Sequence, residues 1–209
     1  MIQEFIKSLS LDIFQALRGM DEEASSIVDG YPTGLNWYGG YVGKKKGTEF
    51  AWCRRLKEYL KEQSWRVREK EEHYPVNPSN RCDLVVDLPD NKPFWIEIKG
   101  AWKEWGRQKK SYENIYKSHL GLDNKKENNA AHDLVRLNTL QLRDASAVGL
   151  LLIGFDSEMV TMNDDIVKFK SLSVLESEQW KLEYDEWKDQ HRRESRCQVR
   201  CWLWWKTIV

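Results

Sequence analysis

The sequence predicts a mixed α/β fold in which helices flank a central mixed sheet of about five strands. Three observations predict it: a strand–turn–strand pattern over residues 81–100, an apolar run at 148–155, and amphipathic helical patterns before and between them. Such an apolar run is typical of a buried strand that pairs in parallel beneath covering helices. The 209 residues are the length of one domain, or of one domain with an extension.

The composition excludes some classes of protein. Lys and Arg total 33, as do Asp and Glu, so the net charge of zero excludes a strongly basic nucleic-acid-binding protein but permits a local basic groove. No apolar run reaches the roughly 18 residues that span a bilayer, and the N-terminus does not resemble an export signal. The four cysteines lack the paired spacing of a structural zinc site. We therefore expect a cytoplasmic protein that does not associate with membranes.

Residues 1–47 are expected to form an N-terminal extension of helix and loop, and residues 48–209 the main domain. Apolar residues recur at helical spacing from residue 2 to about residue 18, which predicts an amphipathic helix that packs on the core or on a partner. The loop-like segment 21–47 contains no G-x-x-x-x-G-K-S/T motif, which excludes a nucleotide-binding P-loop there.

A second helix is predicted from Thr48 to about Gln63, with an apolar stripe at Cys53, Leu56 and Leu60. Glu49 has the phase of this stripe and therefore faces inward. Two explanations of an inward acid in the first turn stay open: it complements the helix dipole, or it binds a metal ion. A strand over residues 65–72 is expected to follow.

The segment 81–100 alternates strictly on both sides of a turn at residues 89–91. Its even positions are apolar, and its odd positions include Asp83, Asp87, Glu97 and Lys99. A turn centred on residue 90 places Asp83 opposite Glu97 and Asp87 opposite Pro93. Facing carboxylates destabilise a strand pair unless a cation lies between them. Asp87 lies near the turn, so we expect it to be solvated or peripheral.

A divalent metal ion would satisfy this requirement. Two carboxylates, with the carbonyl of Ile98 and water, suit Mg²⁺ or Mn²⁺ better than zinc. Lys99 projects on the same face as the two acids. An ordinary cross-strand ion pair gives the same pattern, and this alternative stays open.

The rest of the chain is predicted to alternate between helices and strands. A helix over 130–144 is expected to place Ala131, Leu134, Val135 and Leu142 on one side and Asp133, Arg136 and Arg143 on another. The His132–Asp133 pair is expected to have a capping or surface role. A charged helix is predicted over 172–190, and a last strand over 196–208 with Cys197, Val199, Cys201 and Leu203 on one face.

Aromatic and basic residues interleave directly after Lys99. Basic side chains can neutralise phosphates while aromatic rings stack on exposed bases, so we expect nucleic-acid contacts from Trp102, Lys103, Trp105, Arg107, Lys109 and Lys110. Packing of the tryptophans on the sheet is the open alternative. Lys44, Lys45 and Lys46 precede Glu49 and would add a second basic patch.

This order of a helix with Glu49, a strand, a strand with Asp83, a turn, a Glu97-x-Lys99 strand, a helix and a further strand resembles the PD-(D/E)XK nuclease superfamily. The resemblance covers roughly residues 48–155, with Cys82 in place of the motif's proline. It implies a restriction-endonuclease-like fold for 48–209 and a Mg²⁺- or Mn²⁺-dependent endonuclease acting on DNA. Asp83 and Glu97 would hold the metal, Glu49 would complete its shell, and Lys99 would orient or deprotonate the attacking water.

Such enzymes serve prokaryotic restriction, phage defence or repair, and one of these settings is what the resemblance implies here. Two other functions stay open: a catalytically silent module that binds nucleic acid or a protein partner, and a nuclease that acts on RNA or branched DNA. Cutting a duplex takes two active sites, so a homodimer is the natural expectation for a double-stranded substrate. The helix over residues 2–18 is a candidate surface for that contact or for a protein partner.

Overall fold

The structure, a computed structural model, describes residues 1–23, 27–28, 31–32, 35, 48–69, 72–74, 77–103, 120–122, 129–139, 145–158, 160–172, 175–176, 179–188 and 197–208. The helices are α1 (Ile2–Glu23), α2 (Thr48–Glu62), α4 (Ala130–Thr139) and α5 (Asn163–Lys170). The longer strands are β4 (Asn77–Cys82), β5 (Leu84–Asp87), β6 (Pro93–Trp102), β7 (Ala147–Ser157), β8 (Lys181–Lys188) and β9 (Cys197–Thr207). Three short strands are β1 (Ile27–Val28), β2 (Tyr31–Pro32) and β3 (Glu72–Tyr74).

Five strands form the central sheet in the order β5-β6-β7-β9-β8. Within this sheet β6 and β7 run parallel, and the other neighbouring strands are antiparallel. The apolar run predicted as a parallel strand is β7, in which every residue is buried. The predicted class, a mixed five-stranded sheet flanked by helices, is confirmed.

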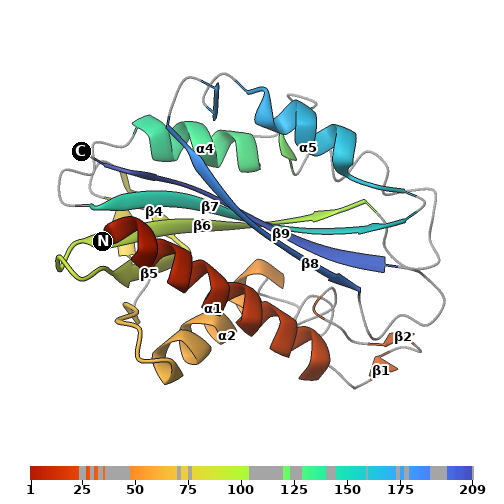
Figure 1. Cartoon of the computed structure of the whole chain (residues 1–209), viewed down its shortest axis with the longest axis horizontal. Coiled ribbons are helices and arrows are strands. Elements are labelled where there is room, and N and C mark those ends of the chain that lie inside the picture. Colours follow the sequence, from red (N-terminus) through yellow and green to blue (C-terminus); the bar gives the residue numbers. More distant parts are fainter. Residues whose placement is uncertain are drawn as a thin grey trace.

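Helices cover both faces of the sheet: α1 and α2 lie on one side, and α4 and α5 lie on the other (Figure 1). The even positions of the β5–β6 hairpin point into the core shared with α1 and α2, as the alternation predicts; they are Leu84, Val86, Phe94, Ile96 and Ile98. Two odd positions, Val85 and Trp95, are buried in a second core with α4 and α5. Charged side chains at other odd positions therefore lie beside a covering layer of helices.

The predicted N-terminal helix is confirmed as α1, which continues to Glu23. Its apolar stripe of Ile6, Leu9, Ile13 and Leu17 is fully buried in the core that contains α2 and the sheet. Trp65 fixes the helix further, because its indole N–H donates to Asp12 at 2.6 Å. A partner of α1 would therefore meet its outer face, where Leu11 is exposed. Among the described residues, none of the helices combines the length and the apolar character needed to span a membrane.

The strand predicted over 65–72 is wrong. Of its described residues, 65–69 include a single isolated bridge, from Val67 to Val86 of β5, and Glu72 begins β3, which pairs with β4 instead. Two backbone bonds, Arg68 N to Val85 O and Asp87 N to Arg66 O, nevertheless hold the segment along the outer side of β5. The segment thus pairs with backbone N–H and C=O groups on the outer edge of β5 without forming a regular strand.

The helix predicted over 172–190 is also wrong, because residues 181–188 form β8, which pairs with β9 at the edge of the sheet. Exposed and partly buried residues alternate along most of β8, and charged side chains on an edge strand oppose pairing with other chains. The last strand is confirmed as β9, with Val199, Cys201 and Leu203 in one core. Helix α5 was not predicted. Residues 140–144 of the helix predicted over 130–144 lie outside the described residues.

Candidate active site at the open edge of β6

The β5–β6 hairpin has the register that the sequence predicts. Leu84 pairs with Ile96 and Asp87 pairs with Pro93, so residue 90 is the centre of the turn. Asn91 has a φ of 62°, a left-handed conformation that asparagine tolerates better than most residues. Asp83 stands just before β5, and Glu97 directly follows Ile96, the last residue of β6 that pairs with β5. The two acids therefore occupy the next opposed position of the hairpin.

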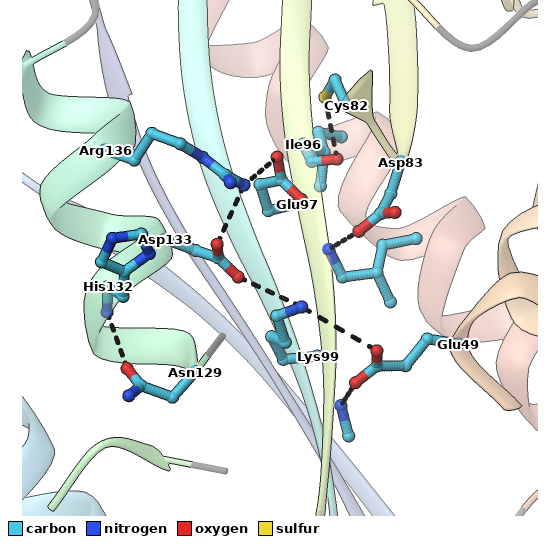
Figure 2. Close-up of polar contacts among 12 residues, drawn as sticks. Glu49, Cys82, Asp83, Ile96, Glu97, Lys99, Asn129, His132, Asp133 and Arg136 are labelled. Carbon is cyan, nitrogen blue, oxygen red and sulfur yellow. Dashed lines mark hydrogen bonds and ion pairs between the residues drawn. The ribbon is translucent and has the colours of Figure 1, made fainter. Parts of the chain in front are cut away.

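Beyond Ile96, the side of β6 that faces β5 pairs with no other strand among the described residues, and we call it the open edge of β6. Backbone groups of alternate residues point to the same side of a strand, so the N–H groups of Ile98 and Gly100 point to this edge, as does the Ile98 carbonyl. The Asp83 carboxylate accepts from Ile98 N at 2.8 Å, and the Glu49 carboxylate of α2 accepts from Gly100 N at 2.9 Å (Figure 2). The open edge thus holds two carboxylates from different elements beside each other.

Lys99 contacts acids from the helices on both faces of the sheet. Its ammonium lies 3.9 Å from Glu49 Oε2 of α2 and 3.3 Å from Asp133 Oδ2 of α4 (Figure 2). The side chain is 17% exposed, and Asp133 Oδ2 is buried with no hydrogen bond besides this ionic contact. The lysine is accordingly held between acids of both helical layers.

Glu97 is buried against α4 and the β3–β4 pair. Its Oε1 accepts from Arg136 Nη2 at 2.5 Å and from the hydroxyl group of Tyr74. Arg136 Nη2 also lies 2.9 Å from Asp133 Oδ1, so the guanidinium bridges two acids. In Figure 2 the second oxygen of Glu97 lies on the side of Asp83.

Sequence reasoning missed three residues of this group: Tyr74, Asp133 and Arg136. The surface role expected for the His132–Asp133 pair is wrong for Asp133, which is 2% exposed, whereas Val135 is 45% exposed. Asn129 sets the phase of α4, because its side chain accepts from the backbone N–H of His132 and caps the helix. The sequence pattern that could have identified Asp133 as buried is the i, i+3, i+4, i+7 spacing of the helix's inward face. That face consists of Ala130, Asp133, Leu134 and Leu137.

Burial and mutual repulsion dominate the electrostatics of the acids. Burial raises the pKa of Glu97 well above its ordinary value, and Asp83 and Asp133 raise it further against the opposing effect of Arg136. Burial likewise raises the pKa of Glu49 and of Asp133, although Lys99 opposes both shifts. For Lys99, burial lowers the pKa, but Asp133, Glu49, Asp83 and Glu97 together outweigh it and raise the pKa. The ammonium therefore stays protonated at neutral pH.

The donor set and the charge of this group fit a hard divalent cation. Four carboxylates face two cations, Lys99 and Arg136, so negative charge is in excess when all the acids ionise. Among the residues that the structure describes, no three acidic, histidine or cysteine side chains lie close enough to form a ready-made metal shell. A pair of carboxylates completed by a carbonyl and water is nevertheless the usual way in which proteins hold Mg²⁺. That Asp83, Glu97, the Ile98 carbonyl and Glu49 hold such an ion remains a prediction.

Most of the residues predicted to contact nucleic acid lie outside the described residues: Lys44, Lys45, Lys46, Trp105, Arg107, Lys109 and Lys110. Trp102 ends β6, but its side chain is not described. Lys103 is only 16% exposed and donates to Asp165 of α5 at 2.7 Å. The ammonium of Lys103 is thus already paired with an acid of the fold, and this pairing does not favour the predicted phosphate contact.

Asp87, the other acid on the odd face of the hairpin, does not join the group. Its Oδ1 accepts from Arg68 Nε at 2.9 Å and from Arg68 Nη2 at 2.8 Å. The side chain is 27% exposed, in agreement with a peripheral position near the turn.

Comparison with models of protein families, with curated proteins and with solved structures finds no significant match to this chain. The function proposed below therefore depends on the geometry and chemistry of the site and on the resemblance of its motif.

Proposed function

We propose that this protein is a metal-dependent endonuclease that hydrolyses phosphodiester bonds of DNA with Mg²⁺ or Mn²⁺ as its cofactor. The observation that carries the proposal is that Glu49 and Asp83 bond to the edge of β6 on either side of Lys99, with Glu97 near enough to Asp83 for the two acids to interact. These residues follow the order of acids and lysine along the chain that the PD-(D/E)XK resemblance requires. The mixed sheet between helical layers agrees with a restriction-endonuclease-like fold, which we propose on the same grounds.

Hydrolysis of a phosphodiester needs an activated water and positive charge near the phosphate oxygens. A bound divalent ion would supply Lewis acidity and lower the pKa of a bound water. Asp83 and Glu97 would hold this ion, and Glu49 would orient Lys99 through its ionic contact of 3.9 Å. The four acids around Lys99 raise its pKa, which favours a role in orienting water and stabilising charge on the phosphate over a role as the base.

A second function, a catalytically silent module that binds nucleic acid or a protein, has one observation in its favour. Each of the three acids already contacts a protein group: Asp83 accepts from Ile98 N, Glu49 from Gly100 N, and Glu97 from Arg136. Contacts of this kind also stabilise an open strand edge without any catalysis. The excess of acids over cations favours the nuclease, because a cluster of buried charges with a purely structural role is more stable when acids and cations are equal in number.

A cleavage assay tests the proposal. Purified protein is incubated with plasmid, linear duplex, single-stranded DNA, branched DNA and RNA, each with Mg²⁺, Mn²⁺ or EDTA. The variants are Asp83→Ala and Lys99→Ala, and the matched control is Asp87→Ala, which removes an acid from the same hairpin outside the site. We expect metal-dependent cleavage of DNA that is lost in both site variants and retained in the control.

Three outcomes would change this assignment. Cleavage in EDTA, or full activity of Asp83→Ala, refutes the site. Cleavage of RNA or branched DNA alone redirects the proposal to that substrate. Metal binding without cleavage of any substrate favours the silent module. If linear duplex is cut on both strands, we propose a homodimer as the active form, to be checked by sedimentation with and without DNA.

A further inference from the structure

Glu97 is bonded asymmetrically. Both of its donors, Tyr74 Oη and Arg136 Nη2, bind the same oxygen, Oε1. Its other oxygen lies on the side of Asp83 in Figure 2. The oxygen that Tyr74 and Arg136 do not bond is therefore the one that lies toward Asp83 (Figure 2).

The two donors are themselves fixed in place. Tyr74 is fully buried, and its ring stacks on Trp95 with a centroid separation of 5.2 Å. The guanidinium carbon of Arg136 lies 5.2 Å from the centroid of the Tyr74 ring, and Nη2 also contacts Asp133 Oδ1 at 2.9 Å. Tyr74, Arg136 and Asp133 thus form a connected support that holds one edge of the Glu97 carboxylate.

We propose that Tyr74 and Arg136 are positioning residues that occupy Oε1 of Glu97 and thereby present its Oε2 to a divalent ion shared with Asp83. This inference rests on the proposed metal-dependent function and adds the two residues that orient the metal ligand Glu97. Groups that hydrogen-bond to a metal-binding carboxylate fix its orientation, and their loss typically weakens metal affinity about 10- to 100-fold. The structure assigns this part to a tyrosine on β3 and an arginine on α4.

The test uses substitutions that conserve charge. Removing a cation beside a divalent ion strengthens binding by itself, so a neutral residue at position 136 would mix two opposed effects. Tyr74→Phe removes only the hydroxyl group and keeps the ring that stacks on Trp95. Arg136→Lys keeps the charge but replaces the guanidinium, whose Nη2 contacts both Glu97 and Asp133, with an ammonium on a shorter and more flexible side chain.

The chain offers a matched control for each substitution. Tyr184→Phe removes another tyrosine hydroxyl that donates to a glutamate, Glu186, at 2.5 Å on the edge strand β8. Arg18→Lys alters another arginine–carboxylate pair, in which Arg18 Nη2 contacts both oxygens of Asp185 at 2.8 and 2.9 Å. Neither pair belongs to the site.

Mn²⁺ affinity is measured by calorimetric titration without nucleic acid, and circular dichroism in EDTA checks that each variant is folded. We expect Tyr74→Phe and Arg136→Lys to bind Mn²⁺ about 10- to 100-fold more weakly than the wild type. Tyr184→Phe and Arg18→Lys should match the wild type.

Folded Tyr74→Phe and Arg136→Lys proteins that bind Mn²⁺ like the wild type would overturn this inference and leave the proposed function standing. A loss in one variant alone would confine the role to that residue and overturn it for the other. A wild type that binds no Mn²⁺, or Asp83→Asn protein that binds it unchanged, would instead overturn the proposed function and this inference with it.

Discussion

Two groups of buried charges lie along the sheet, and they differ in their balance. The site cluster contains the acids Glu49, Asp83, Glu97 and Asp133 and the cations Lys99 and Arg136. The balanced cluster contains Lys103, Asp156, Asp165 and Arg200. In the balanced cluster Lys103 contacts Asp165 at 2.7 Å and Arg200 contacts Asp156 at 3.1 Å, so each buried acid has its own cation.

The ratio of acids to cations distinguishes a cluster with a structural role from one that could bind a cation. A buried pair in good geometry can offset the cost of removing its charges from water, whereas an uncompensated acid cannot. The other oxygen of Asp156, Oδ2, accepts from Met162 N at 2.7 Å, while Oδ1 makes the ionic contact with Arg200 without a hydrogen bond. In the site cluster, burial is the largest cause of the raised pKa of Glu97, and Asp83 and Asp133 raise this pKa further. When its acids are ionised together, the site cluster has the excess of negative charge that the proposed divalent ion would offset.

The largest expected effect is on cleavage. Removing an electrostatic group that acts on the transition state typically costs about 100- to 1,000-fold in rate, so Lys99→Met should lower the cleavage rate by this factor. Asp165→Asn, in the balanced cluster, should retain the wild-type rate per folded molecule. Single-turnover cleavage of a labelled duplex measures both, and equal losses in the two variants would remove the distinction between the clusters.

The next effect is on stability and has the opposite pattern. Asp156→Asn removes the nearer of the two acids at Arg200 and leaves the arginine the 3.7 Å contact with the exposed Glu186, which should cost about 1 to 3 kcal/mol of unfolding free energy. Glu49→Gln keeps an oxygen for Gly100 N and lowers the excess of acids, so in EDTA its stability should stay near that of the wild type. Urea denaturation at neutral pH measures the two changes, and a Glu49→Gln loss as large as that of Asp156→Asn would contradict the comparison.

Metal binding should stabilise the wild type through the site cluster alone. A ligand at 100 times its Kd adds about 2.7 kcal/mol, which for a chain of this size raises Tm by roughly 5 to 10 °C. Asp83→Asn should abolish the Mg²⁺-dependent shift, and Asp165→Asn should preserve it. Thermal denaturation over a Mg²⁺ series checks this prediction, and a full shift in Asp83→Asn would place the ion elsewhere.

Stability without metal should fall as the pH rises from 5 to 8. Burial, with Asp83 and Asp133, raises the pKa of Glu97 above its ordinary value of 4.5, so the fold favours the protonated acid. The stability that this group contributes is complete below its unfolded pKa and is lost as the pH rises through its folded pKa. The raised pKa values of Lys99 and Arg136 affect stability only in the alkaline range. Urea midpoints in EDTA should decline less in Glu97→Gln than in the wild type, and a midpoint that rises over this range would oppose the prediction.

The smallest effect concerns the cap that sets the phase of α4. Asn129→Ala removes the acceptor for the His132 N–H and should cost about 1 kcal/mol. Because α4 carries Asp133 and Arg136, the variant should also weaken Mn²⁺ binding. An Asn129→Ala protein with wild-type stability would show that the cap does not hold the helix.

The sequence predicted the hairpin well because its register depends on local features. Strict alternation fixes which side chains share a face, and a turn at residues 89–91 fixes which residues oppose each other. Glu49 was predicted to face inward for the same reason, since a helix stripe has a defined phase. In each case a local rule determined where the side chain lies.

The residues that sequence reasoning missed depend on contacts between distant elements. Asp133 and Arg136 were predicted on a different side of the helix from its apolar residues, and the structure buries Asp133 because Lys99 and Arg136 contact it, while Arg136 also contacts Glu97. Tyr74 reaches Glu97 from β3, a strand too short to predict. Residues 181–188 were predicted as helix because their charge pattern fits either structure, and pairing with β9 decides between them.

The central claim is that Asp83 and Glu97 share one divalent ion at the open edge of β6. A crystal of the wild type grown with Mn²⁺ tests it most directly, by the anomalous scattering of the metal. The account predicts one strong anomalous peak in contact with both carboxylates and the Ile98 carbonyl, with Arg136 still bonded to Glu97. An Mn²⁺ peak elsewhere, with Asp83 and Glu97 bonded only to protein groups, would contradict it.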